Sequence, residues 1–243
     1  MSSKPIPADF PAYSFPTTKE LEEFFEREHK TAPAFYLKLA KKASGIPSVN
    51  AAEAVETALC FGWIDGWGRK IDDKWWFVRY TPRRAKSIWS QKNVSTVRRL
   101  IETGRMRPAG LAVVDAAKAD GRWDRAYAGP SNITVPDDFA AALKDAPDAA
   151  TFFESFNKTD RYSVLWRVQT ASPTARAGRI EALVQMLSEK KRPTPFTKTV
   201  EKRKMGSEKV EDKKVEKIAK KKIKKEASKP RRSGLRSDPD FKS

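Results

Sequence analysis

Between positions 63 and 93, tryptophans alternate with cationic side chains, and this stretch holds the residues best suited to chemistry. The tryptophans are Trp63, Trp67, Trp75, Trp76 and Trp89, and the cations among them are Arg69, Lys70, Lys74, Arg79, Arg83, Arg84 and Lys86. Flat rings beside positive charges can stack on nucleic-acid bases or clamp a planar anion. The alternative is structural: half of the rings form a core beneath a β-hairpin, and the cations form its solvated face.

The segment TPRRAKSIWSQKN, residues 81–93, is a candidate anion site. Its guanidinium, ammonium, hydroxyl and amide groups can hold a phosphate or a carboxylate through hydrogen bonds. The side chains concerned are Arg83, Arg84, Lys86, Ser87, Ser90 and Asn93. A positively charged loop with a serine helix cap is the alternative. Asp65 either starts the turn into the hairpin or orients one of these arginines.

The chain has one cysteine, Cys60, and one histidine, His29. These counts exclude an intramolecular disulfide, a multi-cysteine metal site and zinc chemistry that needs a histidine pair. The apolar segment TALCFGW predicts a core thiol of raised pKa at Cys60, and His29 is expected on the surface, with a catalytic Cys60–His29 pair as the alternative. The common nucleotide-binding, protease and hydrolase motifs are absent. We therefore expect no metal, no cofactor and a protein that binds rather than catalyses.

Short helices and one β element must position these residues. Prolines keep residues 1–16 extended, a helix follows at about 17–28, and residues 34–42 form a short apolar piece. A helix capped by Ser48 or Asn50 leads into a hairpin whose strands lie on either side of residues 72–73, and Ser95 caps the next helix. A further helix spans about 108–119. The period of apolar residues in each segment indicates which face is buried.

The second half of the chain predicts a helical subdomain. Pro136, Pro147, Thr159 and Ser172 each stand where a helix start is expected. The fold class is therefore α+β and predominantly helical. We divide the chain into an extended lead-in at 1–16, an N-terminal helical domain with a β-hairpin at 17–130, a C-terminal helical subdomain at 131–193 and a disordered tail at 194–243.

Charge is concentrated at the end of the chain. The net charge of the 243 residues is +18, and residues 197–243 alone hold 18 Lys and Arg against 8 Asp and Glu. This tail has too few apolar residues to fold by itself and is expected to attract nucleic acid without sequence preference. No apolar run is long enough to span a membrane, and no signal peptide is recognised. We expect a cytoplasmic protein, or a nuclear one in a eukaryotic cell, where the basic clusters of the tail could act as import signals.

Three motifs read in order resemble the bacteriocin-protection, YdeI/OmpD-associated family. They are ALCFGWIDGWGRKID, YTPRRAKSIWSQKN and RLIETGRMRPAGLAVVDAAKADGRW, and residues 135–193 are similar to the family's C-terminal helical region. The resemblance covers residues 15–193 and implies stress tolerance without an established reaction. It implies a shared polar site at Asp65, Arg83, Ser87, Trp89, Ser90, Asn93, Gly104, Arg105 and Met106. The IDGWGRK segment and the Lys-rich tail depart from the common pattern of the family.

Three functions follow from these patterns. The first is a non-enzymatic binding protein with an anion site near the hairpin and a tail that contacts nucleic acid. The second is an enzyme acting on a small anionic substrate through Asp65, Arg83, Arg84 and Ser87, which requires these residues to share a pocket. The third is a scaffold whose helical half docks a protein partner, which requires an exposed apolar patch.

Overall fold

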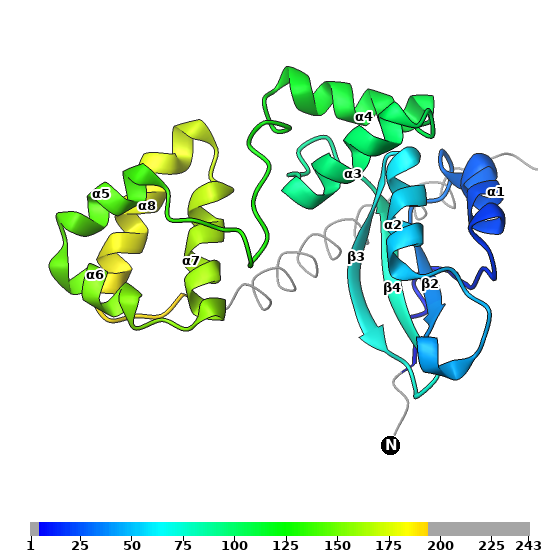
Figure 1. Ribbon diagram of the computed structural model, residues 1–243, viewed down its shortest axis with the longest axis horizontal. Coiled ribbons are helices and arrows are strands. Elements are labelled where there is room, and N and C mark those ends of the chain that lie inside the picture. Colours follow the sequence, from blue (N-terminus) through cyan, green and yellow to red (C-terminus); the bar gives the residue numbers. More distant parts are fainter. Residues whose placement is uncertain (1–4, 194–243) are drawn as a thin grey trace, which may run out of the picture. The chain divides into compact units, whose positions relative to one another are not determined.

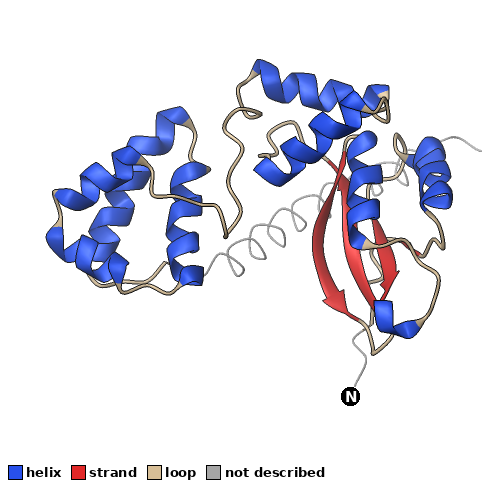
Figure 2. Ribbon diagram, viewed as in Figure 1, coloured by secondary structure: helices blue, strands red, loops and turns tan. Residues whose placement is uncertain are grey.

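The buried apolar side chains form two clusters, one within residues 21–123 and one within residues 139–187. Both belong to residues 5–193, the part of the chain that the computed structural model describes. The first cluster belongs to residues that form a sheet and helices, and the second to residues that form helices alone. Figure 2 shows the sheet and the helices. The α+β fold class is therefore confirmed. The tail predicted to be disordered, residues 194–243, lies outside the described residues.

The sheet has four strands in the order β1-β2-β4-β3. Strand β1 (Ala12–Tyr13) pairs in parallel with β2 (Phe35–Ala40), β2 pairs antiparallel with β4 (Trp75–Pro82), and β4 pairs antiparallel with β3 (Trp63–Lys70). The predicted hairpin is the β3–β4 pair. The description of one small hairpin is nevertheless wrong, because β1 and β2 extend it. A six-residue apolar run does not by itself distinguish a strand from a buried helix, so β2 was not predicted.

A β-bulge in β3 changes the face that its side chains occupy. Between Asp65 and Gly68, β3 advances three positions while β4 advances two. Because side chains alternate between the two faces of a strand, the extra residue reverses the alternation from that point on. Trp67 consequently lies on the face that carries Tyr36 and Phe77, and its ring contacts both of theirs.

Helices α1 (Thr18–Glu28) and α2 (Ala51–Cys60) cover the other face of the sheet (Figure 1). A short 3₁₀ turn, η1 (Lys42–Ser44), follows β2. The side chain of Asn50 caps α2 in a capping box with Glu53, and Thr17 caps α1. The apolar stripes of both helices pack on the sheet, where buried rings, including those of Phe25 and Phe35, form the core. This layer fixes the end of α2 next to the start of β3.

Helices α3 (Gln91–Glu102) and α4 (Pro108–Ala119) complete the first half. Ser90, and not Ser95, caps α3: its Oγ accepts a hydrogen bond from the backbone N–H of Asn93 at 3.2 Å, and Ser95 lies inside the helix. Helix α4 approaches α2 at Gly110, where a Cβ atom would lie 2.2 Å from the carbonyl oxygen of Cys60. The two helix backbones therefore touch at this point.

The second half consists of α5 (Asp137–Lys144), α6 (Pro147–Glu154), α7 (Lys158–Gln169) and α8 (Pro173–Ser188). Helix α8 packs against each of the other three. The predicted helix starts at Pro147 and Ser172 are confirmed, but Asn157 rather than Thr159 caps α7, since its side chain accepts from the backbone N–H of Asp160 at 2.9 Å. The core of this bundle is built around Phe139 and leaves the exposed faces of α5 and α8 open to solvent.

Candidate functional site

Arg83 and Trp89 form the buried base of the loop that connects β4 to α3. The guanidinium of Arg83 lies 3.6 Å from the centre of the Trp89 ring, and its Nη2 donates a hydrogen bond to the carbonyl oxygen of Ile88 at 2.8 Å. Burial lowers the pKa of Arg83 to about 10. Both side chains are almost fully buried. They therefore hold the loop in shape from below and offer little surface to a ligand.

Residues 84–87 form the exposed turn of the same loop. The backbone N–H of Ser87 donates to the carbonyl of Arg84 at 2.9 Å, and the N–H of Arg84 donates to the Ser87 hydroxyl at 3.0 Å. The carbonyl of Ser87 in turn accepts a hydrogen bond from Nη1 of Arg122 at 2.9 Å. The hydroxyl of Ser87 thus stabilises the turn, and the exposed side chain of Lys86 projects from it.

Lys86 lines a cleft of about 300 Å³ together with residues of a later segment. The other lining residues are Ile88, Asp120, Arg122, Arg125, Gln169, Thr170, Ala171 and Ser172. Nε of Arg122 donates to both carboxylate oxygens of Asp120, at 2.8 and 2.7 Å, and this bond keeps the pKa of Asp120 below its ordinary value. Among the described residues that line the cleft, Asp120 is the single acid against three cations. The local charge therefore favours an anion.

Asp65 faces a different cavity, of about 320 Å³, beside α2 and the β3–β4 pair. Burial raises the pKa of Tyr80 and of Tyr127, and the negative charge of Asp65 raises both further. The same charge opposes part of the effect of burial on Arg83. Asp65 is therefore an electrostatic neighbour of the loop, although Arg83, Arg84 and Ser87 do not line its cavity.

Two further predicted residues lie at the start of α3, where Ser90 is the N-cap and Asn93 is in the first turn, whereas Arg105 belongs to a separate ion-pair network. Arg105 pairs with Glu22 at 3.2 Å and with Glu56 at 3.3 Å, and Glu56 also pairs with Arg99. The structure thus distributes the predicted site residues over the loop at 83–93, the Asp65 cavity and the Arg105 network. The loop is the part that borders a cationic cleft.

The Arg105 network lies close to Cys60, and neither Cys60 nor His29 shows the environment of a reactive group. Burial raises the pKa of Cys60 to about 11, in spite of the opposing charge of Arg105. His29 was expected on the surface but is half-buried, with Nδ1 at 2.7 Å from the carbonyl oxygen of Phe25. Its ring also packs beside Phe61.

Sequence reasoning missed Arg122, Arg125 and Tyr127, which build the far wall of the cleft and its support. We predicted a plain connection there, because the segment has no helical period. In the structure, Tyr127 bridges to Ser90, and it exchanges backbone hydrogen bonds with Trp89 and Gln91 on either side. The two arginines within RWDRAY, Arg122 and Arg125, were the sequence feature that could have indicated an anion-binding role for this segment.

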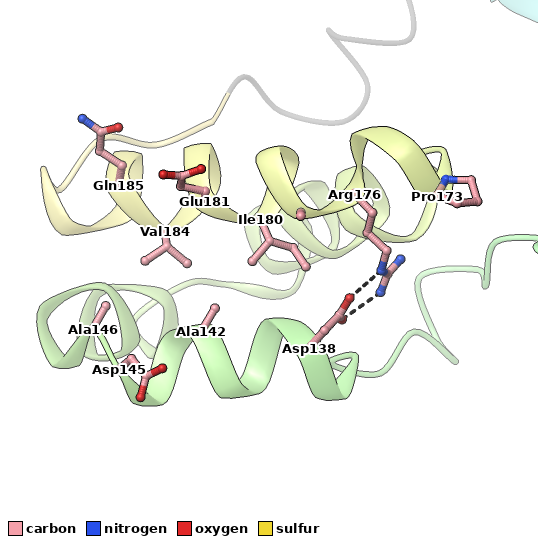
Figure 3. A pocket seen from close by; sticks show the side chains of 11 residues that line it. Asp138, Ala142, Asp145, Ala146, Pro173, Arg176, Ile180, Glu181, Val184 and Gln185 are labelled. Atoms are coloured by element: carbon pink, nitrogen blue, oxygen red, sulfur yellow. Dashed lines mark hydrogen bonds and ion pairs between the residues drawn. The ribbon is translucent and has the colours of Figure 1, made fainter.

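A groove of about 880 Å³ lies between α5 and α8 (Figure 3). Its apolar lining consists of Ala142, Ala146, Pro173, Ala177, Ile180 and Val184. At one end, Asp138 accepts hydrogen bonds from Nε and Nη2 of Arg176 at 2.5 and 2.9 Å (Figure 3). Asp145 and Glu181 also line the groove, and within residues 5–193 neither makes an ion pair. The groove is therefore apolar with an acidic rim.

Residues 5–193 contain no group of three or more His, Cys, Asp or Glu side chains placed to bind a metal ion. Within the same range, no helix has the length and apolar character required to cross a bilayer.

Two family models match the chain, one in each half. Residues 13–113 match a domain of unknown function (DUF8412), and residues 132–190 match the family described as bacteriocin-protection, YdeI or OmpD-associated. Searches of curated proteins and of solved structures gave no match. The loop and the cationic side of the cleft thus lie in or just beyond the first match, and the α5–α8 groove lies in the second. Residues 132–190 are thus similar to the bacteriocin-protection, YdeI or OmpD-associated family, whereas the motifs at 58–72 and 80–93, in which we saw the same resemblance, lie in the match to the domain of unknown function.

Proposed function

We propose that this is an intracellular, non-enzymatic binding protein, associated with stress tolerance, whose cleft at Lys86 holds a small anionic ligand. The observation that carries the proposal is the convergence of Lys86, Arg122 and Arg125 on one cleft in which Asp120 is the single described acid. Phosphate and carboxylate groups are the natural partners of such a set.

The construction of the loop supports this assignment. Arg122 is held in place by Asp120 and by the carbonyl of Ser87, so it contributes positive charge without having to be ordered by the ligand. Lys86 and Arg125 are exposed and can turn toward an anion. Buried Arg83 and Trp89 keep the loop rigid beneath them. The cleft thus combines a fixed cation with two adaptable ones.

Calorimetric titration of the full chain with pyrophosphate and with citrate tests this proposal. Lys86→Ala and Arg125→Ala should each weaken binding about tenfold, which corresponds to about 1.4 kcal/mol for a lost charged hydrogen bond. Lys92→Ala is the matched control, because it removes an exposed cation on α3 outside the cleft. Equal losses in all three variants, or no binding of either anion, would contradict the proposal.

We further propose that the Lys/Arg-rich tail adds non-specific attraction to nucleic acid. Its support is the charge of residues 197–243 alone, 18 Lys and Arg against 8 Asp and Glu. A salt series with DNA and RNA, comparing the full chain with residues 1–196, measures this contribution. The affinity of the full chain should fall steeply with salt, and loss of the tail should remove most of that slope.

A second candidate function, the docking of a protein partner, is favoured by the α5–α8 groove. An apolar lining with two carboxylates that have no described cation partner fits a basic amphipathic helix. A synthetic Lys/Leu helical peptide should bind the full chain, and Glu181→Lys should abolish this binding. Glu154→Lys, on the neighbouring helix α6 and outside the lining residues, is the control that should keep it.

A further inference from the structure

The sheet face opposite α1 and α2 is unusually rich in rings and cations. Register places Tyr36, Lys38, Phe77 and Arg79 on this outer face, and the bulge adds Trp67 and Arg69. The ring of Tyr36 lies 5.2 Å from that of Phe77 and 5.9 Å from that of Trp67. The guanidinium of Arg69 lies 5.9 Å from the Trp67 ring, and Nζ of Lys38 lies 4.8 Å from the ring of Trp75.

Residues 5–11, here called the strap, lie across this face. Nη2 of Arg69 donates a hydrogen bond to the carbonyl oxygen of Pro5 at 2.9 Å. The backbone N–H of Tyr36 donates one to the carbonyl oxygen of Pro11 at 2.8 Å. The strap belongs to no helix or strand, and three of its residues are prolines, which have no N–H to donate. Tyr36 and Phe77 are almost fully buried although they lie on the outer face. The Phe10 ring of the strap lies 6.4 Å from that of Tyr36, and Phe77 is flanked by Trp67 and Arg69.

The contacts of Asp9 and Phe10 show what this face is suited to hold. The hydroxyl of Tyr36 donates to Oδ1 of Asp9 at 2.9 Å, and the guanidinium of Arg79 lies 4.7 Å from the Phe10 ring. An anion followed at once by a flat ring is also what a nucleotide presents, as a phosphate and a base. The strap therefore places nucleotide-like groups on a surface of rings and cations, the combination that binds single strands by stacking and charge.

We propose that the outer face of the sheet is a binding site for single-stranded nucleic acid and that the strap occupies it in competition with the strand. Phosphates replace the carboxylate of Asp9 at Tyr36, and bases replace the ring of Phe10 and stack beside Trp67. Lys38 and Arg69 supply the charge at the edge of the site. This site is separate from the cleft at Lys86, so either proposal can fail without the other.

Fluorescence anisotropy at fixed salt, with 12-nucleotide oligo(rU) and oligo(dT) carrying 5-iodouracil, tests the proposal on the full chain. Removal of the competitor by Asp9→Ala or Phe10→Ala should tighten binding about tenfold. Glu23→Ala removes the same negative charge from the surface of α1, and it should change affinity less than twofold. This matched pair separates competition by the strap from the general attraction of a basic chain.

Removal of a ring or a cation from the outer face of the sheet should act in the opposite direction. Trp67→Leu should weaken binding at least fivefold, and Lys38→Ala, which removes a half-buried cation beside Trp75, two- to fivefold. Cross-links from the iodinated bases should map to peptides within residues 36–79. The proposal is overturned if Asp9→Ala behaves like Glu23→Ala, if neither oligonucleotide binds, or if all cross-links fall in residues 194–243. If only the ribose or only the deoxyribose strand responds, the site stands and its sugar preference is identified.

Discussion

A helix glycine in each half of the described chain has very different surroundings. At Gly110 in the first half, a Cβ atom would lie 2.2 Å from a backbone oxygen of α2, whereas at Gly178 in α8 no atom lies within 4 Å of such a Cβ. Gly110 is buried where two helix backbones are in contact, and Gly178 lies on an exposed face of its helix. An added methyl group should therefore have opposite effects at the two positions.

The largest expected effect is that of Gly110→Ala. The added methyl group meets the backbone of Cys60, which cannot move aside like a flexible side chain, so α2 and α4 must separate. We expect the free energy of unfolding of the first half to fall by at least about 3 kcal/mol. Urea denaturation followed by near-UV circular dichroism measures the loss. A variant as stable as the wild type would show that the contact between the two backbones is looser than described.

A smaller loss is expected for Arg83→Ala. The change removes a buried cation–π contact with Trp89 and the hydrogen bond to the carbonyl of Ile88, and it leaves a cavity. We expect a fall of about 2–3 kcal/mol in the free energy of unfolding, detected by the fluorescence of tryptophan during denaturation. Arg84→Ala, on the exposed turn, should change it by less than about 0.5 kcal/mol. Equal effects of the two changes would place Arg83 on the surface.

The second half should respond to an added methyl group with a gain. Gly178 lies inside α8, is exposed and has open space around its Cα, so Gly178→Ala lowers the entropy of the unfolded chain without a clash. We expect an increase of about 0.5–1 kcal/mol in the free energy of unfolding of the helical half. A thermal melt of the full chain checks the sign. A fall in the melting temperature would show that the space beside Gly178 is not open.

The smallest effect concerns the ion pair at the end of the groove. Arg176 lowers the pKa of Asp138, so the pair adds stability above the ordinary pKa of aspartate and loses it as pH falls through the lowered value. Asp138→Asn should reduce the free energy of unfolding by about 0.5 kcal/mol near pH 7, since both side chains are partly exposed. Denaturation curves of wild type and variant should converge at low pH. A difference that stays constant with pH would assign the effect to packing.

Local signals in the sequence predicted much of the fold. The Asn50 cap, the proline at the start of α4 and the turn between β3 and β4 lie within a few residues of the structure they specify. Strand β2 was missed because FYLKLA has an apolar run that fits a helix as well as a strand, and its pairing with β4 depends on residues about 40 positions away.

The candidate site was less predictable, for a related reason. Arg83 and Lys86 are three positions apart, yet one stacks on a buried ring and the other lines a cleft. Which of two neighbouring cations is buried depends on the aromatic ring folded against it, and the spacing in the sequence does not show this. Arg122 and Arg125 reach the cleft through the bridge between Ser90 and Tyr127, a contact that no local pattern encodes.

The bulge in β3 makes one point of this strand tolerant of a change in length. Asp65 stays opposite Tyr80 and Gly68 opposite Val78, although β3 has one residue more than β4 between these pairs. Deletion of Gly66 would give the two strands equal lengths there, so Trp67 and Arg69 would keep the outer face by plain alternation. A deletion at a regularly paired position of β3 would instead move every later side chain of the strand to the opposite face.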